Sequence, residues 1–566
     1  MIPNDDLKLK EQLKKIWRES QERLVKTSAT TQTGDYLDLT HAPIELDGLK
    51  LVDQARAEEA GAVVFEHKGH KAALGALHPD DPKVKALIDE LKAKGFELRI
   101  FVVSKESLEY ALSFYQFIPK RGEDIVSKVG IGAEEVSRLK KELVTVAKVG
   151  EALTAEFSAN QIATKKIMEI LLAGALNNRA SDIHLESGEE NSKLRYRIDG
   201  VLQIVVEGIP EKVYHLVVSR IKLLSNLRIN ISSEKQDGRF TIDLDGVNIE
   251  MRVSVVPAEF GEAIVMRILD PSAIRLSLTD MGIRPDDLEI MKEEINAPNG
   301  MILNTGPTGS GKTTTLYAFL RTIADSETKV ITIEDPIEYH LDMIEQTQVN
   351  PARGYTFASG LSALMRQDPD AILVGEIRDK ETADIAIQAA LTGHLVFSTI
   401  HANSAAGAVP RLLALGVKAN SIGPALNLAI AQRLVRRICK ECRVAVESSD
   451  DFKTKVEAFY KTLPERAVRP KVEEIKIFNI KQDGDKKGCE KCNFSGYKGR
   501  VGIFELLRVD KEMEKLITET TGEATIEESA IKAGMVTMMQ DGVLRVLSGE
   551  TTFEEVEAVA GKIEGF

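Results

Sequence analysis

The chain has 566 residues, which is too many for one hydrophobic core and predicts three or four domains. It is 43% hydrophobic and 28% charged, as soluble globular proteins are, and no run approaches the twenty apolar residues that a membrane-spanning helix needs. The net charge of −13 disfavours a general nucleic-acid coat. The first residues contain no secretory apolar core, so we expect a cytoplasmic protein.

The first part of the chain carries no catalytic spacing. Apolar residues at helical spacing followed by a Thr- and Ser-rich stretch predict an amphipathic helix and a linker. Short apolar strands and a helix that begins at Pro82 predict a small α/β domain, and a segment of mixed charge predicts a helical connector. These three segments cover residues 1–34, 35–118 and 119–158.

A second α/β domain is predicted for residues 159–273. SDIHLE (181–186) and LRYRIDGVLQ (194–203) each show the alternation of a half-buried strand. Arg239, Arg252 and Arg267 recur on the later strands. From the pattern alone, solvated strand arginines are the simpler interpretation.

A glycine-rich loop follows a linker at 274–283 and belongs to a domain that we expect to cover 284–566. The apolar strand 301–304 leads into GPTGSGKTTT, and a helix follows. Glycines let a phosphate reach backbone N–H groups, Lys312 can reach the β and γ phosphates, and the Thr313 hydroxyl can ligate Mg²⁺. The predicted nucleotide-binding residues are Gly306, Pro307, Thr308, Gly309, Ser310, Gly311, Lys312, Thr313 and Thr314.

Further strands alternate with helices after this loop, which predicts a parallel sheet covered on both faces. They are expected at 330–333, 372–374 and 395–399, and each ends in polar residues. The runs are ITIEDPIEY, AILVGEIRD and STIHAN; the second resembles a Walker B strand with Gly375 where an aspartate is common. Ligands of open α/β sheets bind at such strand ends, so we predict a metal-holding carboxylate, a base and a phosphate sensor there.

Four cysteines form two CxxC pairs, Cys439 with Cys442 and Cys489 with Cys492. Paired CxxC units suit tetrahedral Zn²⁺, and nothing around them resembles a thioredoxin unit, so we favour structural zinc over a redox role. We expect a zinc-binding insertion at 439–503 and a helical C-terminus from 504 onward.

Taken together, these motifs resemble the secretion-ATPase superfamily, and most closely the type IV pilus assembly (extension) ATPases and their type II secretion counterparts. The resemblance covers about 160–566 and is carried by GPTGSGKTTTLY, ITIEDPIEY, RQDPDAILVGEIRD, TGHLVFSTIHANSA, AQRLVRRIC and the CxxC pairs. It implies a RecA-like P-loop ATPase domain, a preceding PAS-like α/β domain, a small N-terminal α/β domain and a four-cysteine zinc insertion.

The resemblance also implies roles for residues around the phosphates. These are Glu338 as general base, Asp335 in the same acidic box, Glu376 as the Walker B acid near Mg²⁺, His394 and His401 as nucleotide sensors, Arg252 and Arg267 as the arginines that close over the phosphates, and Arg239 as a weaker candidate for phosphate contact. Two departures stand out: Ser359 and Ser362 occupy positions where relatives often have arginine, whereas Arg366 is retained.

The implied protein is a homohexameric ATPase with ATP, Mg²⁺ and Zn²⁺ as its cofactors. It would associate peripherally with the inner face of the cell membrane through an inner-membrane platform protein and drive pilus assembly, with 274–283 as a hinge. A type II secretion motor would have identical chemistry and remains an alternative. A nucleic-acid translocase is the alternative of another class, and net acidity makes a nucleic-acid partner unlikely. The CxxC pairs and the N-terminal domain argue against a retraction motor.

Overall fold

The computed structural model describes most of the chain in two compact units, Met1–Ile268 and Leu269–Phe566. The described residues are 35–117, 128–159, 163–189, 191–244, 246–271, 276–447, 449–484, 486–519, 522–563 and 565–566. The helix predicted within 1–34 lies outside this set. In the described part, every helix is too short or too polar to cross a membrane.

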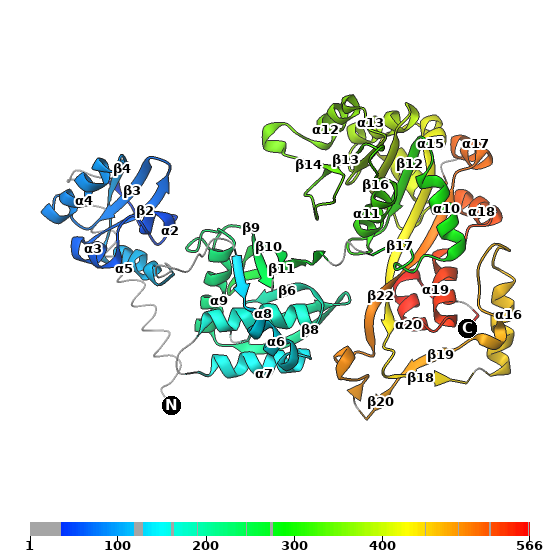
Figure 1. Cartoon of the computed structure of the whole chain (residues 1–566), viewed down its shortest axis with the longest axis horizontal. Helices are drawn as coiled ribbons and strands as arrows, with labels where there is room; N and C mark the ends of the chain where they lie inside the picture. The colour runs from blue at the N-terminus through cyan, green and yellow to red at the C-terminus, as the bar shows by residue number, and fades with distance from the viewer. Residues whose placement is uncertain are drawn as a thin grey trace. The chain divides into compact units, whose positions relative to one another are not determined.

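The N-terminal domain is a four-stranded sheet with helices, as predicted (Figure 1). Its strands are β1 (Asp35–Tyr36), β4 (Glu97–Val102), β3 (Lys71–Ala76) and β2 (Ala62–Lys68) in sheet order, and its helices are α2 (Leu46–Leu49), α3 (Gln54–Ala60), α4 (Pro82–Ala93) and α5 (Lys105–Ser113). Helix α4 starts at Pro82 because the Asp81 carboxylate accepts from the Lys83 N–H at 2.8 Å. It buries Val84, Leu87 and Leu91, one helical stripe.

A seven-stranded sheet forms the second α/β domain of this unit. Its order is β5 (Lys128–Ile131), β9 (Gln236–Leu244), β10 (Val247–Ala258), β11 (Gly261–Leu269), β6 (Ala180–Glu186), β7 (Ser192–Ile198) and β8 (Val201–Ile209). Its helices are α6 (Ala133–Glu142), α7 (Val146–Phe157), α8 (Thr164–Asn177) and α9 (Glu211–Leu224). Strand β5 pairs with β9, and α6 and α7 contribute Leu139 and Leu153 to the core. The expected connector at 119–158 therefore supplies part of this domain from Lys128 onward.

The segment 194–203 is a hairpin, whereas the sequence predicted one strand. Strands β7 and β8 turn at Asp199 and Gly200, which both have positive φ values of 49° and 89°. This is the backbone of a type I′ turn, which Asp-Gly favours. A two-residue turn leaves the alternation of polar and apolar residues unbroken, and this explains why the pattern looked continuous.

The second unit is built on another seven-stranded sheet. Its order is β14 (Glu345–Gln348), β13 (Val330–Glu334), β15 (Ala371–Val374), β16 (Leu395–Ile400), β12 (Gly300–Thr305), β17 (Leu426–Ile438) and β22 (Tyr497–Arg508). Strands β14 to β17 are parallel to their neighbours, and β22 is antiparallel to β17. The strand that bears the loop, β12, lies between β16 and β17, and this order is that of a RecA-like core. All four predicted strands are present.

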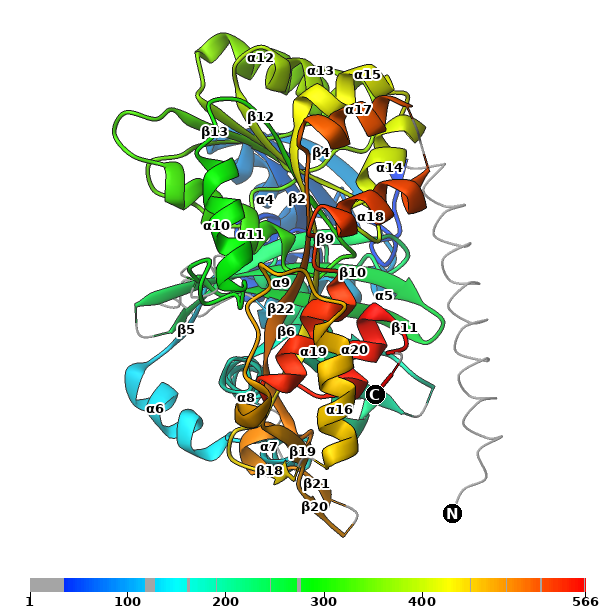
Figure 2. The same cartoon turned by 90° about the vertical axis from the view of Figure 1, so that its right-hand side faces the viewer.

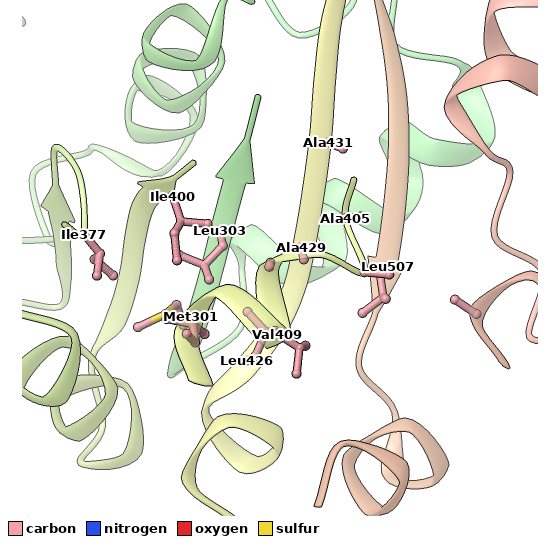
Figure 3. Close-up of a cluster of buried hydrophobic side chains, with 14 of the residues drawn as sticks. Met301, Leu303, Ile377, Ile400, Ala405, Val409, Leu426, Ala429, Ala431 and Leu507 are labelled. Carbon is pink, nitrogen blue, oxygen red and sulfur yellow. The ribbon is translucent and has the colours of Figure 1, made fainter. Parts of the chain in front are cut away.

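Helices cover both faces of this sheet. Met301 and Leu303 of β12 point to a core shared with α12 (Phe357–Leu364), α13 (Lys380–Leu391), α14 (Ala408–Ala414) and α15 (Ala419–Ala425). Figure 3 shows Leu303 and Met301 beside Val409 of α14 and Ala429 of β17. Ile302 points to the other core, with α10 (Pro285–Ile295) and α11 (Lys312–Ile323). Burial on both faces explains the unbroken apolar runs of these strands.

The cysteine-bearing segment differs from the expected insertion at its C-terminal end. Strand β22 begins at Tyr497 and pairs with β17 as far as Arg508, so 497–508 belongs to the main sheet. The insertion proper contains β18 (Arg443–Val446), α16 (Asp450–Tyr460), β19 (Ile477–Ile480), β20 (Gln482–Asp483) and β21 (Lys486–Lys487). Figures 1 and 2 show β17 and β22 extending together toward it. The helical C-terminus follows as α17 (Lys511–Glu519), α18 (Glu523–Lys532), α19 (Met538–Leu547) and α20 (Phe553–Ala560).

Part of the expected hinge at 274–283 is fixed within the second unit. Leu278, Met281 and Ile283 are buried in its core, and the Gly502 N–H donates to the Met281 carbonyl at 3.0 Å. A hinge between the units must therefore lie before Leu278.

Candidate active site

The predicted phosphate loop joins β12 to α11. Gly306, Gly309 and Gly311 have φ values of 146°, 79° and 91°, which side chains on L-residues disfavour. A Cβ on Gly306 would lie 2.6 Å from the Gln432 carbonyl oxygen, and one on Gly311 would lie 2.8 Å from Gln432 Nε2. The geometry therefore requires glycine, and residues 306–314 form one loop and the first turn of a helix, where backbone N–H groups favour an anion.

The Lys312 ammonium lies over this loop. Its Nζ donates to the carbonyls of Gly306 at 2.8 Å and Pro307 at 2.9 Å. Burial lowers the pKa of Lys312, and the Arg433 guanidinium lowers it further, whereas Glu376 acts in the opposite direction. The loop thus holds a partly buried cation whose charge a bound phosphate would neutralise.

The acidic box follows the end of β13. Glu334 is buried and accepts hydrogen bonds from Tyr317 Oη, from Thr332 Oγ1 at 2.6 Å and from Gln346 Nε2 at 3.2 Å. Because Tyr317 belongs to α11, this bond ties the phosphate-loop helix to the strand end that carries Asp335 and Glu338. Burial, together with the neighbouring Glu334 carboxylate, raises the pKa of Tyr317, so its hydroxyl remains a donor.

Glu376 lies after β15, at the same edge of the sheet. It pairs with Arg378, and His401 Nε2 lies 3.8 Å from its second oxygen. A Cβ on Gly375 would lie 3.3 Å from the Ile333 carbonyl oxygen, tighter than ordinary contact. The close approach of β13 to residue 375 therefore disfavours the aspartate that is common there.

The two predicted histidines stand at opposite ends of β16. His401 follows the strand at the phosphate-loop edge, whereas His394 precedes it and its carbonyl accepts from the Gly300 N–H, where β12 begins. Its Nδ1 lies 3.1 Å from the Ala389 carbonyl oxygen. Within one chain, the strand therefore separates His394 from the loop.

Three contributors to this edge were not among the predicted site residues. They are Glu334, Tyr317 and Gln432. Gln432 is buried, and its Oε1 accepts from Asn304 Nδ2 at 3.0 Å and from Thr315 Oγ1 at 2.8 Å. Gln432 thereby braces both ends of the loop. In the sequence, Gln432 belongs to the AQRLVRRIC run, which is part of the family resemblance. No role was assigned to this residue from the run.

The predicted arginines of the other unit share one face of its sheet. Arg239 and Arg252 are direct cross-strand partners on β9 and β10, and Arg267 stands on the adjacent β11. Like charges directly opposite each other are destabilising in a sheet, so this face favours an anion. Arg267 is 54% exposed, and its Nε donates to Asp182 Oδ1 at 3.1 Å, which orients it.

The two unusual serines lie on α12. Ser359 forms a capping box with Thr356: its N–H donates to Thr356 Oγ1 at 3.2 Å, and its Oγ accepts from the Thr356 N–H at 2.9 Å. Ser362 offers its carbonyl to Arg366 Nη1 at 2.9 Å. Ser359 therefore has a local structural role that an arginine could not fill.

The four cysteines converge at the end of β17. Their sulfur atoms all lie within 4.8 Å of one another, with Cys489 and Cys492 at 3.8 Å and Cys439 and Cys489 at 4.0 Å. Tetrahedral zinc with Zn–S bonds of about 2.3 Å separates its sulfurs by about 3.8 Å. Cys492 Sγ also accepts from the N–H of Gly496 at 3.3 Å. The donor set and spacing fit a closed structural zinc site, and all four thiols are free of disulfides.

Comparison with known proteins agrees with this geometry. Residues 158–558 match the family described as Type II/IV secretion system protein. The chain is 35% identical to the type IV pilus assembly ATPase PilB of Myxococcus xanthus (strain DK1622), over 98% of this chain and 97% of that protein. It is 38% identical to the type II secretion system ATPase E of Vibrio cholerae serotype O1, over 84% and 90%.

A solved structure shares the fold. The X-ray structure of the Yersinia pseudotuberculosis ATPase DotB is 19% identical, with a TM-score of 0.51, and the match covers 70% of this chain and 92% of that one. The family match spans more than half of the chain, and the PilB match spans nearly all of it. This chain belongs to the Type II/IV secretion system protein family.

Proposed function

We propose that the chain is an ATP-hydrolysing motor that drives type IV pilus assembly. It acts as a homohexamer at the inner face of the cell membrane, on an inner-membrane platform protein. The observation that supports the ATPase part is the order of the parallel strands: the 306–314 loop, the acidic box and Glu376 follow β12, β13 and β15, whose C-terminal ends lie at one edge of the sheet. Phosphoryl transfer needs just such positioning and charge neutralisation.

Each group at this edge has a task in the proposed reaction. Lys312 and the loop N–H groups neutralise the β and γ phosphates of ATP. The Thr313 hydroxyl and Glu376 would hold Mg²⁺, which supplies further charge neutralisation when bound. Glu338 accepts the proton of the attacking water, Asp335 belongs to the same acidic segment, and His401 senses the nucleotide from beside Glu376.

The sheet face of the preceding domain that carries Arg239, Arg252 and Arg267 supplies the conformational change of the proposed cycle. We propose that Arg252 and Arg267, with Arg239 beside them, close on the γ phosphate and withdraw after hydrolysis. Arginines of this kind contribute on the order of 10³ to 10⁵ in rate in other phosphoryl-transfer enzymes. His394, which lies at the far end of β16 within its own chain, would reach a nucleotide only by a contribution between subunits. The four cysteines would hold Zn²⁺ as a structural staple.

Pilus assembly is preferred to type II secretion because of coverage. The match to the pilus ATPase includes 98% of the chain, whereas the match to the type II ATPase includes 84% at slightly higher identity. A type II secretion motor is the second candidate, since that higher identity favours it and its chemistry is the same.

The deciding experiment measures both activity and cargo. Purified wild-type protein should hydrolyse ATP in the presence of Mg²⁺, and Lys312→Ala should not. In the source organism, deletion of the gene should abolish surface pili, and the platform protein of the pilus machine should co-purify with the protein from membranes. Absence of hydrolysis by the hexamer would refute the motor. Loss of secreted proteins with normal piliation would transfer the assignment to type II secretion.

A further inference from the structure

Arg433 lies beside the phosphate loop on β17, and β17 is on the other side of β12 from β13 and β15, which precede the acidic residues. Strands β12 and β17 pair as far as Thr305 and Ala431, and the two residues after Ala431 continue along the loop. A Cβ on Gly306 would lie 3.0 Å from Arg433 Nη1, so the guanidinium packs against the first glycine of the loop.

The guanidinium has only backbone carbonyls as hydrogen-bond partners among the described residues. Its Nη1 donates to the Gln432 carbonyl at 3.1 Å and its Nη2 to the Asn403 carbonyl at 3.0 Å. No carboxylate in the described part of the chain lies within ion-pair distance of it. The nearby Glu505 carboxylate is buried and instead accepts from the N–H groups of Ala405 at 2.8 Å and Met538 at 3.1 Å.

Other arginines of the same strand are paired differently. Arg436 binds the Glu555 carboxylate with Nε at 2.8 Å and with a second nitrogen. Arg437 lies 3.7 Å from Glu550. A half-buried guanidinium without a carboxylate is costly unless an anion compensates it, so Arg433 stands apart from its neighbours.

A second cation shares the same loop. Among the residues that the structure describes, the hydrogen-bond partners of Lys312 are likewise backbone carbonyls, those of Gly306 and Pro307, at 2.8 and 2.9 Å. Arg433 lies close enough to lower the pKa of Lys312, and burial lowers the pKa of Arg433 itself. Lys312 and Arg433 are thus two cations at one loop whose N–H groups also favour anions. Because each cation repels the other, together they indicate a ligand with more than one negative charge.

We propose that Arg433 is a further nucleotide-binding residue, whose guanidinium contacts the polyphosphate of ATP or ADP from the β17 side. This inference rests on the proposed function only in taking the ligand to be a nucleotide. Arg433 would bind within its own protomer and would retain the product, unlike arginines that move with hydrolysis. Gln432, directly before it, keeps the loop and the guanidinium in register.

The test is equilibrium binding of ADP, pyrophosphate and adenosine to the full-length protein by calorimetry. Loss of one charge-assisted contact should weaken ADP and pyrophosphate about tenfold or more in Arg433→Gln and in Arg433→Ala, with little change for adenosine. Arg433→Lys should recover part of the affinity, because it restores the charge without the planar fork. Arg437→Ala, on the same strand, is the matched control and should bind ADP as the wild type does.

Several outcomes overturn the inference. Wild-type affinity for ADP in the folded Arg433→Gln variant would do so, and so would an equal loss for adenosine and ADP, which indicates a general disturbance of the site. A wild-type protein that binds no nucleotide at all would instead refute the proposed function. The glutamine variant keeps a donor for the two carbonyls, so it remains informative if the alanine variant fails to fold.

Discussion

Strand β17 serves two sites that differ in how their polar groups are satisfied. Beside the phosphate loop, buried amide and hydroxyl groups satisfy one another through Gln432, whereas Lys312 and Arg433 have backbone carbonyls as their hydrogen-bond partners within the described part of the chain. At the end of the strand, Cys439 opens a cluster whose thiols lie at metal-ligand spacing from one another. The first arrangement favours a ligand that exchanges, and the second favours an ion that stays.

Strand β17 therefore connects a site expected to serve turnover with a site expected to serve stability. Strands β17 and β22 pair from Leu428 and Arg508 to Ile438 and Tyr497, with a register shift between Arg436 and Ile438, so the sheet that holds the loop continues to the cysteines. A closed tetrahedral site leaves no position for substrate or water. We therefore expect changes at the loop to alter kinetics, and changes at the cysteines to alter the stability of the 439–496 segment.

The largest effect should come from Glu338→Gln. Removal of the proposed general base should lower kcat by about 10³, because proton transfer contributes about 10² to 10⁴. The affinity for ATP should stay within about threefold, since the phosphate loop is untouched. Steady-state hydrolysis and ATP-binding measurements check both values, with the exposed Glu345→Gln on β14 as the matched carboxylate control. Normal hydrolysis by Glu338→Gln would contradict the assignment of Glu338 as the general base.

Cys442→Ser should have the next largest effect, and on stability. One lost ligand opens the tetrahedral set, and the free energy that holds the 439–496 segment should fall by roughly 3 kcal/mol. Elemental analysis should find about one zinc per chain in the wild type and less in the variant, and limited proteolysis should cut this segment first. ADP affinity should not change. Freshly purified wild type without zinc would contradict the metal assignment.

Tyr317→Phe tests the bond between the loop helix and the acidic box. Loss of the hydroxyl leaves the buried Glu334 carboxylate with one fewer donor, which should lower the free energy of unfolding by about 1–2 kcal/mol. We expect kcat to fall about tenfold with little change in KM, because Asp335 and Glu338 follow directly. Thermal unfolding and steady-state kinetics measure the two effects.

Tyr355→Phe provides the control for that variant. It removes a hydroxyl that donates to Thr347 Oγ1 on β14 at 3.0 Å, whereas the Tyr317 hydroxyl donates to Glu334 itself. Equal kinetic defects in the two phenylalanine variants would show that Tyr317 acts on stability alone.

The residues that the sequence singled out for this edge of the sheet belong to motifs that are contiguous along the chain. The loop residues 306–314 and the acids at strand ends follow from local spacing, and the strand order of the sheet places them together. Gln432 and Arg433 could not be assigned this way, because they reach the loop through pairing with β12 across more than a hundred residues. No role was assigned to Tyr317 at the end of the GPTGSGKTTTLY run, because its bond to Glu334 depends on tertiary structure.

Misassigned elements have equally physical reasons. The hairpin at 194–203 kept its alternation through a two-residue turn, and β5 is too short to carry a periodic signal. Strand β22 was expected to be helical after 503 because burial on both faces removes the alternation of a strand. The insertion that contains the cysteines was therefore expected to be longer than it is.

The smallest expected effect concerns Ser359, which stands where the resemblance leads us to expect an arginine. Its hydroxyl completes the capping box of α12, so Ser359→Ala should lower the free energy of unfolding by at most about 1 kcal/mol. Neither kcat nor ADP affinity should change, because the serine acts on the helix end and not on phosphates. Chemical denaturation and hydrolysis assays check this, with Ser362→Ala in the same helix as control. A fall in kcat at unchanged stability would mean that this serine contacts a neighbouring subunit, and would make position 359 part of the motor even without an arginine.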